Sequence, residues 1–368
     1  MIGPACNACL RASVLRSEAL RYAEAAFSRT VDAAALLRLD TREMHEQLTR
    51  LHPEVDQRME RQMQGLLESV DERFGTVWTV CMHSPEFPSR LTLLDDTPPV
   101  VYGIGNATLL ASLEHSEAIA IVGARRASSY GREVAYTLGN EASSLGLVAV
   151  SGMALGVDGA AHRGALQGGG RTIAVLAGGP DVAYPASHRR LHEQIADIGC
   201  VVSENPPGTG AKRWAFVARN RVIAGLSALS VFVEGSESSG ARHTMEFAEQ
   251  IDSAVGAVPG PVTSPLSAGP NAMLSRDEAV VIRDIADVLD TLAIEFGGPP
   301  QGVASIPALE GLRADVFALV AAGDSSPREI ANGLPGSGVR EIVRTLGELE
   351  LAGVVKREQG GGYRAIES

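Results

Sequence analysis

The amino-acid sequence predicts an α/β fold, with a doubly wound and mainly parallel sheet between an N-terminal all-α domain and a C-terminal winged helix. The sheet is predicted by short apolar runs at residues 118–122, 147–150, 172–176, 200–203, 229–233, 254–258 and 279–282. Most of these runs are unbroken rather than alternating, which is typical of strands covered on both faces. Helix-length segments separate most of them, as repeated strand–helix–strand units require.

The chain before the sheet divides into two segments of different character. Residues 1–74 are rich in alanine, leucine, arginine and glutamate, which predicts a small helical (SAM-like) domain with three-turn helices such as 17–27 and 41–51. Residues 75–114 contain a β-branched run and several prolines, which fix extended connections. We expect this second segment to connect the helices to the sheet domain, residues 115–290.

The chain after the sheet begins with a linker that carries proline and glycine, residues 291–308. The remaining residues, 309–368, have the pattern of three helices and a hairpin with Gly360, Gly361 and Gly362 at its tip, which predicts a winged helix. This segment has 7 basic and 9 acidic residues, which favours a protein-contact or accessory role over DNA reading.

Composition limits the class of protein. A chain of 368 residues is expected to form two or three domains. The net charge of −12 argues against a uniformly basic surface that coats nucleic acid, and it leaves room for a local basic site. Aromatic residues make up only 4%, so a stacking surface must use very few rings. Four scattered cysteines do not make a disulfide scaffold, and no apolar run reaches about 18 residues. We therefore expect a cytoplasmic protein without a membrane partner.

The first candidate binding loop is GARRASSYG, directly after a predicted strand. Gly123 allows close backbone approach, and Ser128 or Ser129 can cap the helix that follows. Arg125 or Arg126 can direct a guanidinium at an anion on that helix N-terminus. Phosphate binding is one interpretation of the loop, and a helix cap flanked by solvated arginines is the other.

The second candidate loop is SGMALGVDG, which again follows a predicted strand and starts at Ser151. Gly152 and Gly156 allow the backbone to form a concave row of amides that binds anions, and Asp158 is placed to cap the next helix. The spacing is not G-x-G-x-x-G, and G-x-x-x-x-G-K-[ST] does not occur in the chain. A dinucleotide fingerprint and a Walker-type NTPase are therefore both excluded.

The third candidate is a basic tract, the densest basic neighbourhood of the chain. Arg219 and Arg221 flank Asn220, and Lys212 and Arg213 lie just upstream. Backbone phosphates of a single DNA strand are the partner that such a groove would hold. A surface of ordinary salt bridges is the alternative interpretation.

Charge is unevenly distributed over the predicted sheet domain. Residues 115–225 contain 11 basic and 8 acidic side chains, whereas residues 226–290 contain 3 and 10. A fourth loop lies in the acidic part, between a predicted strand and a predicted helix. Its Ser239 and Gly240 offer a hydroxyl and an amide at the helix start.

The sequence gives little support for a catalytic site. His188 and His192 are four residues apart, but HRRLH lacks the glutamate of a zincin, so a solvated helix is the preferred interpretation. His162 is expected to belong to a helix-packing or polar network. No G-x-S-x-G nucleophile elbow occurs.

A metal site is not expected either. Cys6 and Cys9 form a Cys-x-x-Cys pair without a second such pair. Zinc held together with His45 and His52 is a minor alternative. We therefore predict no metal, no cofactor and no enzymatic activity.

The motifs together resemble those of the DNA-processing protein A family, also called Smf. The resemblance rests on GARRASSYG, SGMALGVDGAAHRGAL, RNRVIAGLS and AVPGPVTSPLSAGPNAML, in that order. It implies a Rossmann-like domain that binds single-stranded DNA, works as a homodimer and loads the RecA recombinase onto incoming DNA during natural transformation. Leu155 stands where many members have a basic residue, and the N-terminal CNAC is not general to the family.

Single-stranded DNA binding is therefore the predicted function, and the resemblance places Arg125, Ser151, Gly152 and Arg219–Arg221 in the family's DNA pocket. The full set of predicted DNA-binding residues is Gly123, Arg125, Arg126, Ser128, Ser151, Gly152, Lys212, Arg219, Asn220, Arg221, Ser239 and Gly240. The alternative is a nucleotide-processing enzyme similar to a phosphoribohydrolase, which would need an acid/base carboxylate such as Asp158 or Glu204.

Overall fold

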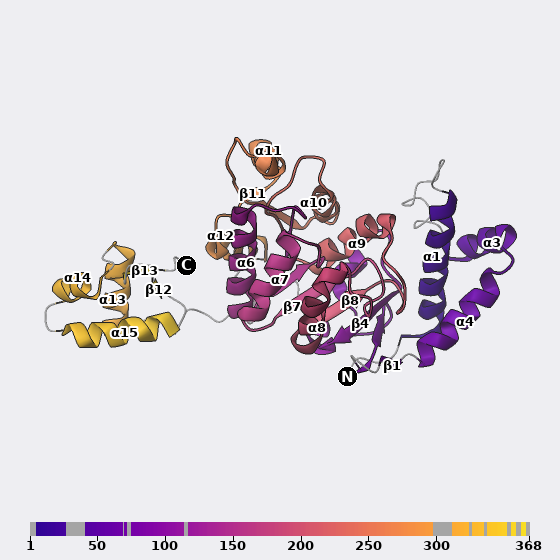
Figure 1. Cartoon of the computed structure of the whole chain (residues 1–368), viewed down its shortest axis with the longest axis horizontal. Helices are drawn as coiled ribbons and strands as arrows, with labels where there is room; N and C mark the ends of the chain where they lie inside the picture. Colours follow the sequence, from indigo (N-terminus) through magenta and orange to yellow (C-terminus); the bar gives the residue numbers. More distant parts are fainter. Residues whose placement is uncertain are drawn as a thin grey trace. The chain divides into compact units, whose positions relative to one another are not determined.

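The structure is a computed structural model that describes residues 5–26, 41–68, 70–71, 75–113, 117–296, 311–323, 326–334, 337–351, 355–357 and 362–365. The chain separates into two compact units, residues 1–302 and 303–368. Figure 1 shows the elements of both units.

The first unit is built on a sheet that contains nine strands within the described residues. Their order is β11-β10-β9-β5-β6-β7-β8-β4-β3. The strands from β11 to β8 are parallel, whereas β4 is antiparallel to β8 and β3 is antiparallel to β4. The bounds are β3 Trp78–Cys81, β4 Val100–Gly105, β5 Ala118–Val122, β6 Val148–Ser151, β7 Thr172–Val175, β8 Cys200–Ser203, β9 Leu229–Phe232, β10 Ala254–Ala257 and β11 Val280–Val281.

The predicted parallel sheet is confirmed, since each of the seven apolar runs forms one of its parallel strands. The prediction for residues 75–114 is corrected, because this segment supplies the two antiparallel strands β3 and β4 rather than a mere connection. Its prolines lie outside the two strands, so the apolar runs remain free to form ladder hydrogen bonds. Between the strands lies a short 3-10 helix, η1 Ser89–Leu93.

The helices cover both faces of the sheet, and the direction of the chain decides which face each one covers. From β5 to β8 the chain steps one way, so right-handed crossovers place α6, α7 and α8 on one face. They pack side by side (Figure 1). From β9 to β11 it steps the other way, which places α10 on the opposite face, against α9. The bounds are α5 Ala107–Ala111, α6 Ser129–Ser144, α7 Val157–Gln167, η2 Ala186–His188, α8 Arg189–Ile198, α9 Arg213–Leu226, α10 Gly240–Gln250, η3 Pro265–Ser267, α11 Ala268–Ser275 and α12 Ile285–Phe296.

The strand order also contains a topological switch point. The chain leaves β5 to form β6 on one side, and later returns to pair β9 along the other side of β5. In open α/β sheets ligands bind in the crevice at the carboxyl ends of the strands where this reversal occurs. The loops after β5 and β9 are therefore the place at which a binding site is expected.

The N-terminal helices belong to the first unit. They are α1 Asn7–Ala26, α3 Thr41–Leu51 and α4 Val55–Glu68, and a short ladder of β1 Val70–Asp71 and β2 Gly75–Thr76 follows. The helix predicted at 41–51 is confirmed, but α1 begins well before residue 17 and has 20 residues. Its early part is stabilised by packing against the sheet, where the Tyr102 hydroxyl donates to Ser13 Oγ (3.1 Å). Such a tertiary contact cannot be read from the helix propensity of the local sequence.

The second unit has its own apolar core, in which Val316, Ile330, Ile342 and Leu346 are fully buried. It comprises α13 Leu312–Ala321, α14 Pro327–Gly333, α15 Val339–Leu351 and the antiparallel pair β12 Val355–Arg357 and β13 Tyr363–Ala365. These elements follow the predicted order, and the winged-helix assignment and its role stay predictions. Gly360 and Gly361, at the predicted tip, lie outside the described residues.

No helix among the described residues combines the length and the apolar composition that a membrane span requires.

Candidate nucleic-acid interface

A pocket of about 380 Å³ lies at the topological switch point. Its walls come from the loop after β5, the loop after β6, the helix α9 and the start of α10. The residues of α9 that line it include Phe216, Arg219, Asn220 and Ile223, which share one helix face at the spacing i, i+3, i+4, i+7. One face of a single helix thus forms one wall of the pocket.

The loop after β5 is held in place by the buried carboxylate of Glu234, which lies two residues after the end of β9. Ser128 donates to it twice, from its backbone N (2.9 Å) and from its hydroxyl (2.6 Å). The same hydroxyl accepts from Gly131 N and caps α6, as the sequence predicts. Gly123 lies where a Cβ would come within 2.8 Å of the Glu234 carbonyl oxygen, so the loop can pass β9 this closely only with glycine at that position.

Arg125 and two aromatic rings, the exposed Tyr184 and the half-buried Phe216, form the rim of this pocket. The guanidinium carbon of Arg125 lies 5.0 Å from the centroid of the Phe216 ring, a cation–π distance. The Tyr184 ring packs against the Phe216 ring, with 5.1 Å between the two ring centroids. Arg213, also exposed, lines the same pocket, whereas Arg126 is exposed outside it.

Tyr184 and Phe216 were not predicted from the sequence as site residues, and Arg213 was named in the basic tract but not included among the predicted DNA-binding residues. A signal was available, because RWAF precedes the basic tract and rings are scarce in this chain.

The loop after β6 is held by Arg219, which is buried rather than exposed. Its Nη1 donates to the carbonyl oxygens of Gly152 (2.7 Å) and Val175, and its Nε donates to Asn220 Oδ1 (3.3 Å). A Cβ on Gly152 would lie 2.1 Å from that Nη1, so only glycine leaves space for the guanidinium. Burial lowers the pKa of Arg219 to about 10, which still leaves it charged at neutral pH. Arg219 therefore positions the loop from beneath.

The expected cap of α7 is corrected by the structure. Gly156 occupies the N-cap position with φ of 79°, and Asp158 lies inside the first turn. The Asp158 carboxylate instead accepts from Ala154 N at 3.3 Å and so holds the preceding loop. Burial raises the pKa of this carboxyl, and nearby Arg219 opposes the shift. A glycine at the cap is required because a Cβ there would lie 2.2 Å from Ala124 O.

The start of α10 closes the pocket. Asn220 Nδ2 donates to the Gly240 carbonyl oxygen at 2.9 Å and ties α9 to this helix. Ser239 is the N-cap residue but makes no side-chain cap hydrogen bond. Its Oγ is a buried oxygen without a hydrogen-bond partner among the described residues. A helix N-terminus with an unsatisfied hydroxyl is suited to receive an anion.

Six of the predicted residues do not line this pocket: Arg126, Ser128, Ser151, Gly152, Lys212 and Arg221. The Ser151 side chain is fully buried and donates to Ile121 O at 2.6 Å. Arg221 lies on another side of α9, where it donates to Glu204 Oε2 (2.7 Å) and Asp96 Oδ2 (2.6 Å). These carboxylates raise the pKa of Arg221 against the effect of its burial. Both residues thus have structural partners away from the pocket.

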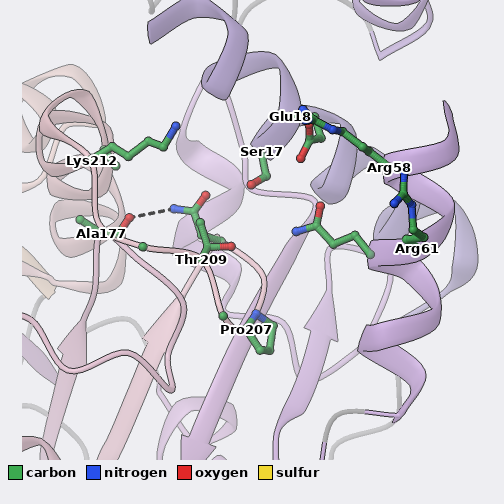
Figure 2. Close-up of a pocket in the computed structure, with 13 residues that line it drawn as sticks. Ser17, Glu18, Arg58, Arg61, Ala177, Pro207, Thr209 and Lys212 are labelled. Atoms are coloured by element: carbon green, nitrogen blue, oxygen red, sulfur yellow. Dashed lines mark hydrogen bonds and ion pairs between the residues drawn. The ribbon is translucent and has the colours of Figure 1, made fainter. Parts of the chain in front are cut away.

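Lys212 lines a second cavity of about 640 Å³, between α1, α4 and the segment that leads into α9. Figure 2 shows Lys212 across the cavity from Arg58 and Arg61 of α4, with Glu18 beside Arg58. The start of α9 separates the two cavities, because Lys212 lines one and its neighbour Arg213 lines the other.

The histidines that the sequence singled out are buried. The interpretation of His188 and His192 as solvated is wrong, because their ring nitrogens lie 2.9 Å from Met153 O and 2.7 Å from Pro180 O. His162 belongs to a polar network as expected, with Nδ1 2.8 Å from Thr172 Oγ1.

Residues 78–293 match the family described as DNA recombination-mediator protein A. The chain belongs to this family. A putative DNA processing protein DprA from Mycobacterium tuberculosis is 38% identical over 269 residues, which cover 72% of this chain and 68% of the relative. Protein Smf from Escherichia coli is 32% identical over 76% of this chain and 75% of its own.

Solved structures of the family share the fold. The X-ray structure of DNA processing protein A from Streptococcus pneumoniae has a TM-score of 0.57 at 28% identity, over 76% of this chain and 92% of that one. A Helicobacter pylori protein, whose structure is reported for its single-stranded DNA binding mode, has a TM-score of 0.52 at 29% identity, over 56% of this chain and 93% of that one. The mixed α/β architecture with a largely parallel central sheet is thus the architecture of the family.

Proposed function

We propose that this protein binds single-stranded DNA in the pocket at the carboxyl ends of β5, β6 and β9. The observation that carries the proposal is the group formed by the exposed Arg125 and Tyr184 with the half-buried Phe216 between them. A single strand offers unstacked bases and a line of phosphates, so rings and guanidiniums side by side suit both parts of each nucleotide.

Each part of the pocket has a separate task in this proposal. Arg125 and Arg213 contact phosphates, and the N-terminus of α10 with Ser239 receives another. Bases stack on Phe216 and Tyr184, which makes binding tolerant of sequence. Arg219 stays buried and positions the loop after β6 through its hydrogen bond to the Gly152 carbonyl oxygen.

The biological role is proposed from family membership. The protein protects incoming DNA and loads the RecA recombinase onto it during natural transformation, as a homodimer in the cytoplasm and without enzymatic activity. The Helicobacter pylori relative, reported for its single-stranded DNA binding mode, supports the binding of single-stranded DNA in this role. The second unit, with 7 basic and 9 acidic residues from 309 to 368, serves as an accessory or protein-contact module.

Fluorescence anisotropy with a labelled thymidine oligomer over a salt series tests the DNA site. Arg125→Ala should lower the slope of log K against log salt by about 0.7, the value for one lost phosphate contact on a single strand. Phe216→Ala should weaken binding by about 1–3 kcal/mol, the cost of one lost base stack, with an unchanged slope. Arg171→Ala is the matched control. Arg171 directly precedes β7 and so lies at the amino ends of the parallel strands, away from the pocket at their carboxyl ends. Unchanged affinity and slope in both pocket variants would refute the site.

A nucleotide-processing activity is the second candidate, and Asp158 is the observation in its favour. This buried carboxylate lines the pocket, and its pKa is raised by burial. Glu204, the other candidate, is already engaged with Arg221. Incubation with nucleoside monophosphates tests the idea: base release at enzymatic rates that Asp158→Asn abolishes would favour the enzyme over the DNA-binding protein.

A further inference from the structure

Four soft ligand groups from distant parts of the chain converge at the start of α1. Cys6 precedes the first residue of this helix, and Cys9 lies in its first turn. Cys81 is the last residue of β3, and His83 follows in the next turn. The three Sγ atoms and a ring nitrogen of the histidine all lie within 4.8 Å of one another.

The cluster has the size of a tetrahedral zinc site. With Zn–S bonds of about 2.3 Å and Zn–N bonds of about 2.05 Å, the edges of the tetrahedron are about 3.8 Å between sulfurs and about 3.6 Å between sulfur and nitrogen. His83 Nδ1 lies 3.6 Å from Cys6 Sγ and 3.3 Å from Cys9 Sγ. The side chains are therefore already arranged at ligand spacing.

The chemistry of the ligand set favours zinc in a structural role. Three cysteines and one histidine are a known structural zinc combination, and four protein ligands leave no open position for substrate. Two short-spaced pairs, Cys-x-x-Cys and Cys-x-His, supply them from two elements. The alternative with His45 and His52 as ligands is wrong, because the groups that gather around Cys6 and Cys9 are Cys81 and His83, and His45 Nε2 lies 2.7 Å from Asp56 Oδ1. We propose that these four side chains, Cys6, Cys9, Cys81 and His83, bind one zinc ion as a structural site.

Two features support metal binding over a disulfide. All the cysteines are free thiols, although three of them meet in one place, and a disulfide would use only two of them and would not account for His83. Cys6 and His83 are exposed, whereas Cys9 and Cys81 are buried, so an ion can enter from solvent and end half enclosed.

The site would fix the N-terminal helices to the edge of the sheet. β3 is the outermost of the described strands, and Ala5, two residues before α1, donates from its backbone N to Thr79 Oγ1 of this strand (3.0 Å). The same helix carries Ser17 and Glu18, which line the cavity that Lys212 also lines (Figure 2). A zinc ion at the start of α1 therefore holds that cavity wall in place.

Metal analysis of the full-length protein, purified under reducing conditions without chelator, tests the proposal. The wild type should contain one zinc ion per chain. Cys6→Ser and His83→Asn should lose the zinc, although both side chains are exposed and neither packs in a core. Cys200→Ala, a buried thiol outside the cluster, and His45→Asn are the matched controls and should retain it.

Two further measurements keep the test independent of folding. Cobalt substitution of the wild type should give the charge-transfer and d–d bands of tetrahedral thiolate coordination, and chelator should lower the melting temperature of the wild type but not of Cys6→Ser. A zinc-free wild type whose thiols are joined in a disulfide by mass spectrometry would overturn the proposal. Full zinc content in Cys6→Ser and His83→Asn, or its loss from His45→Asn, would also overturn it.

Discussion

Replacement of Arg219 by alanine should destabilise the protein strongly and weaken DNA binding without removing a phosphate contact. The side chain is only 5% exposed, and its Nη1 donates to the buried carbonyl oxygens of Gly152 and Val175. An unsatisfied buried acceptor costs about 1–3 kcal/mol, so the two together predict a loss of about 2–6 kcal/mol in the free energy of unfolding.

Urea unfolding and the salt dependence of single-strand binding measure the two consequences separately. Arg219→Ala should lower the unfolding free energy by the stated amount, and its salt slope should equal that of the wild type. Arg125→Ala, at an exposed position, should change the unfolding free energy by less than about 0.5 kcal/mol while its slope falls. Full stability of Arg219→Ala together with a slope that falls by about 0.7 would contradict the buried position of this side chain and would place it at the DNA.

Three further predictions concern the scaffold. Burial holds the pKa of His162 at about 3, below its unfolded value of about 6.5, so the unfolded state binds the proton first and stability falls as pH drops below about 6.5. Urea unfolding at pH 7 and pH 5 should differ by about 2 kcal/mol on this account, and His162→Gln should remove that difference. Arg221→Ala should cost about 3–5 kcal/mol, because Glu204 loses its buried partner, with no change in the salt slope of DNA binding; a changed slope would place Arg221 at the DNA. Gly139→Ala puts a Cβ 2.3 Å from Ala161 O and should cost about 1–3 kcal/mol by thermal or urea unfolding, and an undisturbed melting temperature would contradict the close contact of α6 and α7.

The sheet was predictable because its strands are encoded locally. An unbroken apolar run between turn residues can be recognised without knowing its partners, as the match of residues 200–203 to β8 illustrates. The strand β3 was misjudged as part of a connection because its neighbouring prolines dominate the local pattern. The length of α1 was underestimated because its first half depends on contacts with the sheet.

The candidate site was predictable as a set of loops, and less so as a set of side chains. Arg219 and Arg221 are two residues apart on α9, so they point to different sides of the helix and cannot both face one pocket. Helical phase would have favoured Phe216, which lies on the same face as Arg219. Burial of Ser151 and the ion pairs of Arg221 depend on residues far away in the chain.

The cysteine cluster was beyond local patterns for the same reason. Cys6 and Cys9 are separated from Cys81 and His83 by the whole helical segment, and the turn that brings the two pairs together depends on the antiparallel strand β3. The nearer histidines, His45 and His52, were the better candidates by sequence distance alone.

Photo-crosslinking of a single strand that carries 5-iodouridine, followed by mass spectrometry of the crosslinked peptides, tests the central claim most directly. The pocket at the switch point predicts crosslinks at Phe216 or Tyr184, and their loss in Phe216→Ala and Tyr184→Ala. Crosslinks confined to residues 303–368 would contradict it, because the DNA would then bind the second unit instead.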